Sequence, residues 1–160
     1  MYLDAYYSGA EFPGGLAFRK ALGQCSLDGT LDSLDRVDSL LDQIRKKLRP
    51  QFDPFLEDAA NQNFLYLLCF YVGDVIGRSS GKRVRWLSYP DMLREIPDKA
   101  QRTMFPECFQ TSATCITAAS FFVPLASIVS RLFDEHVTKS VRASAEANAM
   151  PQPRNYSPGR

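Results

Sequence analysis

The sequence lacks a substantial net charge. Its 160 residues include 19 Lys or Arg and 18 Asp or Glu, which leaves a formal charge of +1. A chain without a strong field of one sign has no general attraction for nucleic acid or for an anionic membrane. We therefore expect neither as a partner, and any charged partner must be recognised by a local patch.

The residues of common catalytic and metal sites are also scarce. His136 is the single histidine, so a Ser-His-Asp or Cys-His site would have to use His136 itself. No C-x-x-C pair occurs among the four cysteines, which are Cys25, Cys69, Cys108 and Cys115. This spacing predicts neither a zinc site nor a disulfide framework. We expect reduced thiols, no metal and no cofactor.

Signals for export or membrane insertion are weak. The first residues include Asp4 and Glu11 and lack the basic start and apolar core of a secretory signal peptide, so the expected location is cytoplasmic. The uncharged stretch 109–130 is long enough to cross a bilayer, for which about 20 residues suffice. Its seven Ser or Thr residues and Pro124 lower its hydrophobicity. A buried strand followed by a helix is therefore favoured over a membrane span.

The densest apolar run covers residues 64–76 and contains one charged residue. Apolar side chains point in nearly every direction around this segment, which predicts a central helix buried on all sides. Asp53 and Pro54 are a favoured N-cap and first-turn residue, so we expect the helix to run from Asp53 to about Gly77. Gly73 lies four residues before Gly77, and this pair leaves one face open to the close approach of another element.

A second long helix is predicted between Thr30, a favoured N-cap, and Pro50, which ends helices. Apolar residues recur within it at steps of three and four: Leu34, Val37, Leu41, Ile44 and Leu48. A stripe of aspartates lies beside this seam: Asp32, Asp35, Asp38 and Asp42. Because the stripe is offset from the seam, we expect it to face solvent. It is either a solvated helix face or a docking surface for a basic partner.

The remaining segments complete the predicted architecture. Val84 and Trp86 alternate with arginines, which predicts a short half-buried strand, and a second strand is predicted within residues 108–117. A helix is expected after Ser120. The fold class is therefore α-rich α+β: a central buried helix with packed helices and a minimal antiparallel sheet, in one globular domain over residues 1–149. Three prolines and no apolar periodicity predict a disordered tail over residues 150–160.

A basic cluster surrounds Trp86 and consists of Arg78, Lys82, Arg83 and Arg85. Basic residues beside an aromatic ring are one ingredient of single-stranded nucleic-acid binding. With a single Trp and almost no net charge, a solvated strand face is the favoured interpretation.

The segments SLDRVDSLLD, FLYLLCFYVGDVIGR and VRW resemble a group of small uncharacterised bacterial proteins. In that group an aromatic helix with spaced glycines leads to a Trp-bearing strand. The resemblance covers Ser33 to Trp86, about a third of the chain. Some proteins of this kind are similar to immunity or accessory proteins of toxin-delivery systems, which implies binding rather than catalysis. The resemblance transfers no site residues.

These patterns predict a non-enzymatic protein-protein binding module, and a toxin-neutralising immunity protein is one form of it. The expected partner is another protein, such as a basic toxin or effector. The predicted partner-binding residues are Asp32, Asp35, Asp38 and Asp42. The alternative is a small-ligand-binding protein or an enzyme with a pocket near Tyr71, Gly73 and Trp86.

Overall fold

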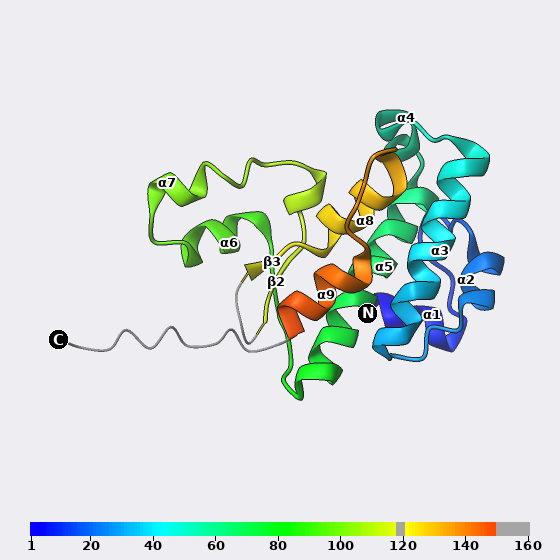
Figure 1. The fold of residues 1–160 in the computed structure, drawn as a ribbon, viewed down its shortest axis with the longest axis horizontal. Coiled ribbons are helices and arrows are strands. Elements are labelled where there is room, and N and C mark those ends of the chain that lie inside the picture. The colour runs from blue at the N-terminus through cyan, green and yellow to red at the C-terminus, as the bar shows by residue number, and fades with distance from the viewer. Residues whose placement is uncertain (118–120, 150–160) are drawn as a thin grey trace.

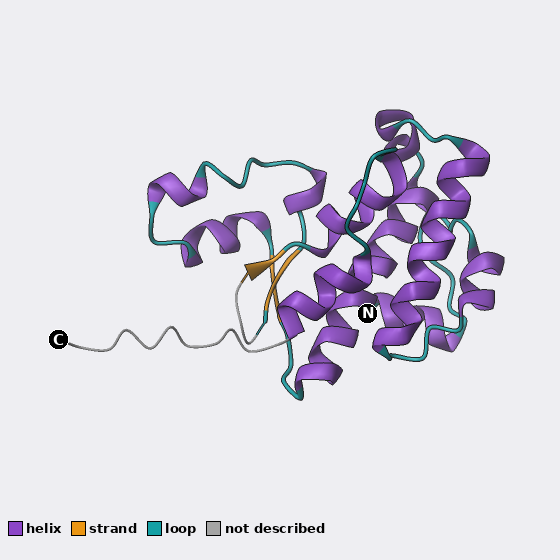
Figure 2. Cartoon of the chain, in the orientation of Figure 1, coloured by secondary structure: helices purple, strands orange, loops and turns teal. Residues whose placement is uncertain are grey.

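The computed structural model describes residues 1–117 and 121–149. Most of these residues are helical, and a small sheet lies between a helical body and an excursion formed by α6 (Tyr89–Glu95) and α7 (Lys99–Arg102) (Figures 1 and 2). The predicted α-rich α+β class is therefore confirmed. The predicted tail, residues 150–160, lies outside the described residues.

The helix α5 (Ala59–Ser80) is the centre of the body (Figure 1). The residues that it buries cover most of its circumference: Phe64, Leu65, Leu67, Leu68, Cys69, Tyr71, Val72, Gly73, Val75 and Ile76. The helices in contact with it are α1 (Tyr2–Ser8), α3 (Leu31–Leu48), α4 (Phe52–Glu57), α8 (Pro124–Phe133) and α9 (Val141–Ala149). The helix is therefore buried over most of its surface, as its apolar pattern predicts. One stripe at steps of three and four is only half-buried: Asn63, Tyr66, Phe70, Asp74 and Gly77.

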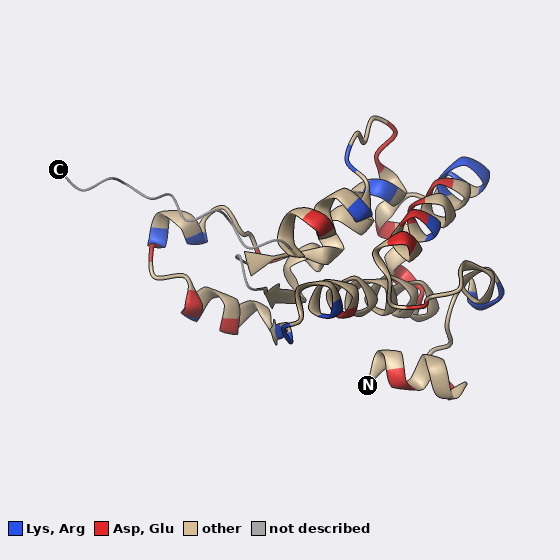
Figure 3. Ribbon diagram, turned by 60° about the horizontal axis from the view of Figure 1, so that its bottom comes forward, with Lys and Arg blue, Asp and Glu red and all other residues tan. Residues whose placement is uncertain are grey.

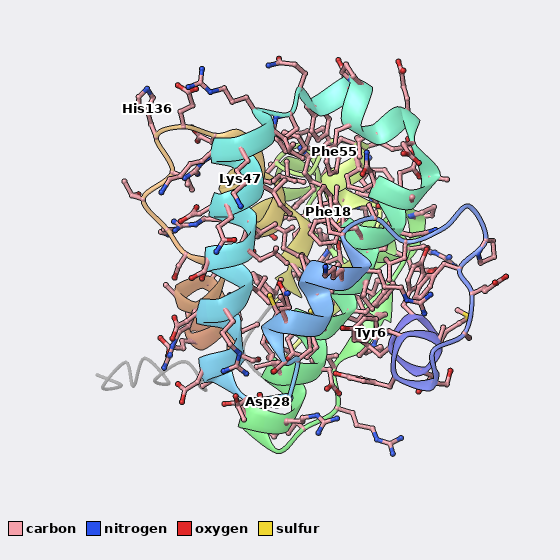
Figure 4. All side chains as sticks on the ribbon, turned by 90° about the vertical axis from the view of Figure 1, so that its right-hand side faces the viewer. Tyr6, Phe18, Asp28, Lys47, Phe55 and His136 are labelled. Carbon is pink, nitrogen blue, oxygen red and sulfur yellow. The ribbon has the colours of Figure 1, made fainter. Side chains whose placement is uncertain are left out.

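The start predicted for the central helix, Asp53, is wrong. Residues 52–57 form the separate helix α4, and the backbone leaves helical geometry at Asp58, whose carboxylate caps α5 through a 2.9 Å bond to a backbone N–H. Asn61 and Gln62 donate their side-chain amides to carbonyl groups of α4, at 3.0 and 2.6 Å. The break is stable because both new helix ends find partners. It also turns Phe55 into the core, where it lies near Phe18 (Figure 4).

The helix α3 begins and ends where its sequence predicts. The Thr30 hydroxyl accepts a 3.2 Å bond from the N–H of Ser33, and Arg49 takes a left-handed conformation, with φ of 44°, before Pro50. Four of the five predicted seam residues are buried. Leu48, the fifth, is 59% exposed because it lies in the last turn, beyond the elements that cover the seam. The short helix α2 (Arg19–Cys25) packs on the same helix.

The sheet contains β1 (Arg85–Leu87), β2 (Thr114–Ile116) and β3 (Phe121–Phe122) in the antiparallel order β1-β2-β3. Trp86 stands opposite Cys115. Residues 88–113 join the first two strands and contain α6, α7 and the 3₁₀ turn η1 (Phe109–Thr111). The predicted second strand is therefore only partly a strand, because its first half forms η1. A separate apolar cluster holds the excursion to the sheet and consists of Leu87, Met92 and Ile96.

The uncharged stretch 109–130 supplies η1, β2, β3 and the first part of α8. The helix after Ser120 begins at Pro124, since proline fits the first turn of a helix. Over the described ranges, 1–117 and 121–149, the structure has no helix with the length and apolar character of a membrane span.

Candidate functional site

Two of the four predicted partner-binding aspartates are withdrawn from solvent. All four lie on α3, whose acidic positions can be followed in Figure 3. Asp32 and Asp35 are exposed, but Asp38 is only 6% exposed and the side chain of Asp42 only 21%. The expectation that the stripe faces solvent is therefore wrong for Asp38 and Asp42.

Asp38 caps α9 from outside that helix. Its two carboxylate oxygens accept bonds from the N–H groups of Val141 and Arg142, at 2.8 and 3.2 Å. These groups open α9 and have no partner within it, and a carboxylate also complements the positive end of the helix dipole. Burial raises the pKa of Asp38, while the two N–H groups and Arg131, 3.5 Å away, act in the opposite direction.

Asp42 and Arg45 bind the C-terminal end of α8. Asp42 binds Arg131 at 2.5 Å and Arg45 at 2.9 Å. The Arg45 guanidinium also donates to the backbone carbonyls of Arg131 and Asp134, at 2.9 and 3.1 Å. One face of α3 thus closes the last turn of α8 and the first turn of α9.

The two exposed aspartates also have a basic partner in this chain. Arg142 of α9 binds Asp32 at 2.9 Å and pairs with Asp35 and Glu146. Asp38 and Asp42 therefore hold α9 and α8 in place, whereas Asp32 and Asp35 pair with Arg142 at the surface. A partner protein would compete with Arg142 for Asp32 and Asp35, and binding by the stripe stays a prediction.

An open groove of about 900 Å³ lies on another face, between α1, the second half of α5 and the segment that leads into β1. We call it the α1–α5 groove. Besides the exposed Met1, its apolar lining consists of Tyr2, Leu3, Phe70, Val84 and Trp86. These five side chains are half-buried and still offer surface to the groove. Four of them pack on the core, and Phe70 packs on the rings of Tyr2 and Trp86.

Two glycines of α5 let the chain fold back to form this groove. A Cβ atom at Gly73 would lie 2.3 Å from Cζ2 of Trp86, and one at Gly77 would lie 3.0 Å from the carbonyl oxygen of Lys82. The predicted close approach to the glycine pair is therefore confirmed. With no side chain in the way, the indole of Trp86 sits against α5 and meets the ring of Phe70 edge to face, with centroids 4.7 Å apart.

The charges of the groove are unevenly paired. Asp74 binds Arg78 at 2.7 Å, and Asp4 pairs with the amino group of Met1. Lys82 and Arg83 are exposed and have no ion-pair partner among the residues that the structure describes. The groove therefore combines an apolar lining with two uncompensated cations at its rim. Basic positions are visible in Figure 3 where the chain passes from α5 toward α6.

The pocket predicted near Tyr71, Gly73 and Trp86 is partly realised. Gly73 and Trp86 line the α1–α5 groove. Tyr71 is fully buried instead, where its hydroxyl accepts a 2.9 Å bond from the N–H of Gly29 and pairs with the hydroxyl of Ser33. It acts as a polar tie between α5 and the start of α3, away from the groove.

The single histidine is exposed, whereas three of the four cysteines are buried. His136 lies on the outer edge of the loop that follows α8 (Figure 4), where a hollow of about 520 Å³ opens. Burial raises the pKa of the Cys69 thiol, and it raises the pKa of Cys115 to about 12, so both stay protonated near neutral pH. Within the described part of the chain, no group of three His, Cys, Asp or Glu residues is placed to hold a metal ion.

Comparisons with known proteins add no assignment. No protein-family model, no curated protein and no solved structure matches the chain. The resemblance to immunity and accessory proteins therefore stays a prediction.

From the sequence, the basic cluster around Trp86 could be recognised, but the contribution of α1 to the groove could not, because the first residues have no clear apolar period.

Proposed function

We propose that the chain is a protein-binding module and that the α1–α5 groove is its binding face. The observation that carries this proposal is the combination of half-buried aromatic side chains with the unpaired cations Lys82 and Arg83. Aromatic side chains that are partly buried before binding lose little conformational entropy when a partner covers them. Trp, Tyr and Arg are the residue types that most often dominate binding energy at interfaces.

The shape of the groove favours a protein partner over a small ligand. Sites for small molecules bury most of the ligand surface within about 300–1,000 Å³. The α1–α5 groove has that volume, but it is only partly enclosed. An open apolar groove suits a segment of another protein, because the rest of that protein can shield the bound segment from solvent.

The aspartate stripe is a weaker candidate for the same role. Asp38 and Asp42 are engaged with α8 and α9, and Asp32 and Asp35 share the guanidinium of Arg142 with Glu146. A basic toxin or effector would meet Arg142 at these two positions. Toxin neutralisation is still a biological role that a binding module with this groove could serve.

The test is a pull-down of native partners with two matched variants. Lys82→Glu with Arg83→Glu reverses the charge at the rim of the groove. Lys46→Glu with Lys47→Glu makes the same change of charge at exposed positions of α3, where Lys47 is labelled in Figure 4. We expect the groove variant to lose a partner that the wild type and the α3 variant both capture.

Thermal unfolding must first show that both variants fold like the wild type. Capture of the same proteins, in the same amounts, by both variants would refute the groove as the binding face.

A further inference from the structure

We infer that the partner places an acidic segment with a large apolar side chain in the α1–α5 groove. This inference rests on the proposed function and adds the chemistry of the partner. It follows from the order of the aromatic rings in the groove and from the charges that remain unpaired around them.

The aromatic rings provide a continuous surface for an apolar anchor. Tyr2 stacks on Phe70, with ring centroids 5.2 Å apart and planes 27° apart, and Phe70 meets Trp86 at 4.7 Å. The hydroxyl of Tyr2 donates to the side-chain oxygen of Asn63 at 3.1 Å, which holds this ring in place. A side chain inserted here would meet rings that are already oriented, and an aromatic or long aliphatic side chain would fill the space best.

The charges select an acidic partner. Five charged side chains line the groove, and the two acidic ones, Asp4 and Asp74, already have partners. Next to the groove, Arg85 is paired with Glu95 at 3.0 Å. Lys82 and Arg83 are then the charges left to meet an incoming segment. A basic segment would be repelled by them, whereas Asp or Glu would pair with them and raise the rate of association.

Nucleic acid is a less suitable occupant. Non-specific binding of a single strand requires bases to stack on open aromatic faces beside a track of cations. The benzene ring of Trp86 is seated against Gly73 and Phe70, so the indole is not a free platform. Only two unpaired cations lie at the rim, too few to follow a phosphate backbone over several nucleotides.

A random dodecapeptide display library tests this chemistry directly. The library is selected against the wild type, the Lys82→Glu and Arg83→Glu variant, and the Lys46→Glu and Lys47→Glu control. We expect the wild type and the control to enrich peptides that combine Asp or Glu with Trp, Phe or Leu. The groove variant should enrich peptides with Lys or Arg instead. Wild-type peptides without acidic residues, or the same peptides from all three proteins, would overturn the inference.

The fluorescence of Trp86 supplies the second measurement, because it is the only tryptophan and lies in the groove. Titration with the most enriched peptide should change its emission, and the Kd should rise roughly tenfold between 0.05 and 0.5 M salt, because salt screens the charge pairs formed by Lys82 and Arg83. An oligothymidylate of about twelve nucleotides should not displace the peptide. Displacement by the oligonucleotide would overturn the inference in favour of nucleic acid.

The two proposals can fail separately. If capture of the native partner depends on Lys82 and Arg83 but the selected peptides are not acidic, the groove is the binding face and the inferred chemistry is wrong. If the groove variant captures the native partner like the wild type, the proposed function itself is wrong.

Discussion

Replacing Gly73 by alanine would place a methyl group inside the contact between α5 and Trp86. Its carbon would lie 2.3 Å from Cζ2 and 2.9 Å from Cη2 of the indole. Unbonded carbon atoms prefer separations of about 3.5–4.0 Å, so the indole must move by roughly 1 Å. Trp86 is in the middle of β1, and Phe70 packs against its ring, so this movement disturbs both contacts.

Two opposing effects set the change in the free energy of unfolding. Alanine is better than glycine inside a helix by about 1 kcal/mol. Forcing an extra carbon into a filled contact costs about 1–3 kcal/mol. We expect the second effect to dominate and the variant to lose about 1 kcal/mol, which corresponds to a Tm lower by about 2–4 °C for a domain of this size.

Urea unfolding measured by Trp86 fluorescence and by circular dichroism provides the assay. Gly23→Ala is the matched control, because Gly23 is also helical and a Cβ there would meet nothing within 4 Å. It should stabilise the protein by about 0.5–1 kcal/mol. In a Trp86→Ala background, Gly73→Ala should become stabilising as well. If Gly73→Ala stabilised the wild type as much as Gly23→Ala does, the described contact with the indole would be refuted.

Three further outcomes are expected from the core and from the cap of α9. Leu68→Ala should cost about 2–5 kcal/mol, because Leu68 is fully buried in α5, and a urea midpoint like that of the wild type would contradict its central place. Asp38→Ala should lower the free energy of unfolding by about 2–4 kcal/mol and speed amide exchange in α9, since two N–H groups lose a charged acceptor. Asp35→Ala should leave the free energy of unfolding and the exchange rates nearly unchanged. Because burial raises the pKa of Asp38, the folded state binds a proton at this carboxyl more tightly than the unfolded state does. The stability gained from this proton binding is lost as pH rises through the raised pKa. The stability of the wild type relative to Asp38→Asn should therefore be greater at pH 4 than at pH 7, and a pH-independent difference would contradict the assignment.

The elements that could be predicted from the sequence are those with local signals. Thr30 and Pro50 mark the ends of α3, and the apolar run of residues 64–76 identifies the buried helix α5. The break at Asp58 could not be predicted in the same way. Both Asp53 and Asp58 are suitable caps, and the choice depends on side-chain amides that satisfy the end of α4.

The candidate site was predictable to a similar degree. The glycine pair predicted that another element approaches α5 closely, and the basic cluster could be recognised because its residues are close together in the sequence. The role of the aspartate stripe was not, because it depends on residues far along the chain. Arg131 is 89 residues from Asp42, and Val141 is 103 residues from Asp38. A helical pattern read locally cannot distinguish a carboxylate that faces water from one that faces a later helix.

The capping of α9 by Asp38 has a consequence for the nascent chain. At about 5–20 residues per second, a ribosome needs roughly 5–20 s to add the 103 residues between Asp38 and Val141. Local helices form within microseconds, so α3 can form long before its carboxylate receives an N–H group from α9. During that interval the apolar surfaces of α3 and α5 that α9 later covers stay open to chaperones. We expect chains stalled before Val141 to be sensitive to proteases at these helices, and chains that also include α9 to be protected there.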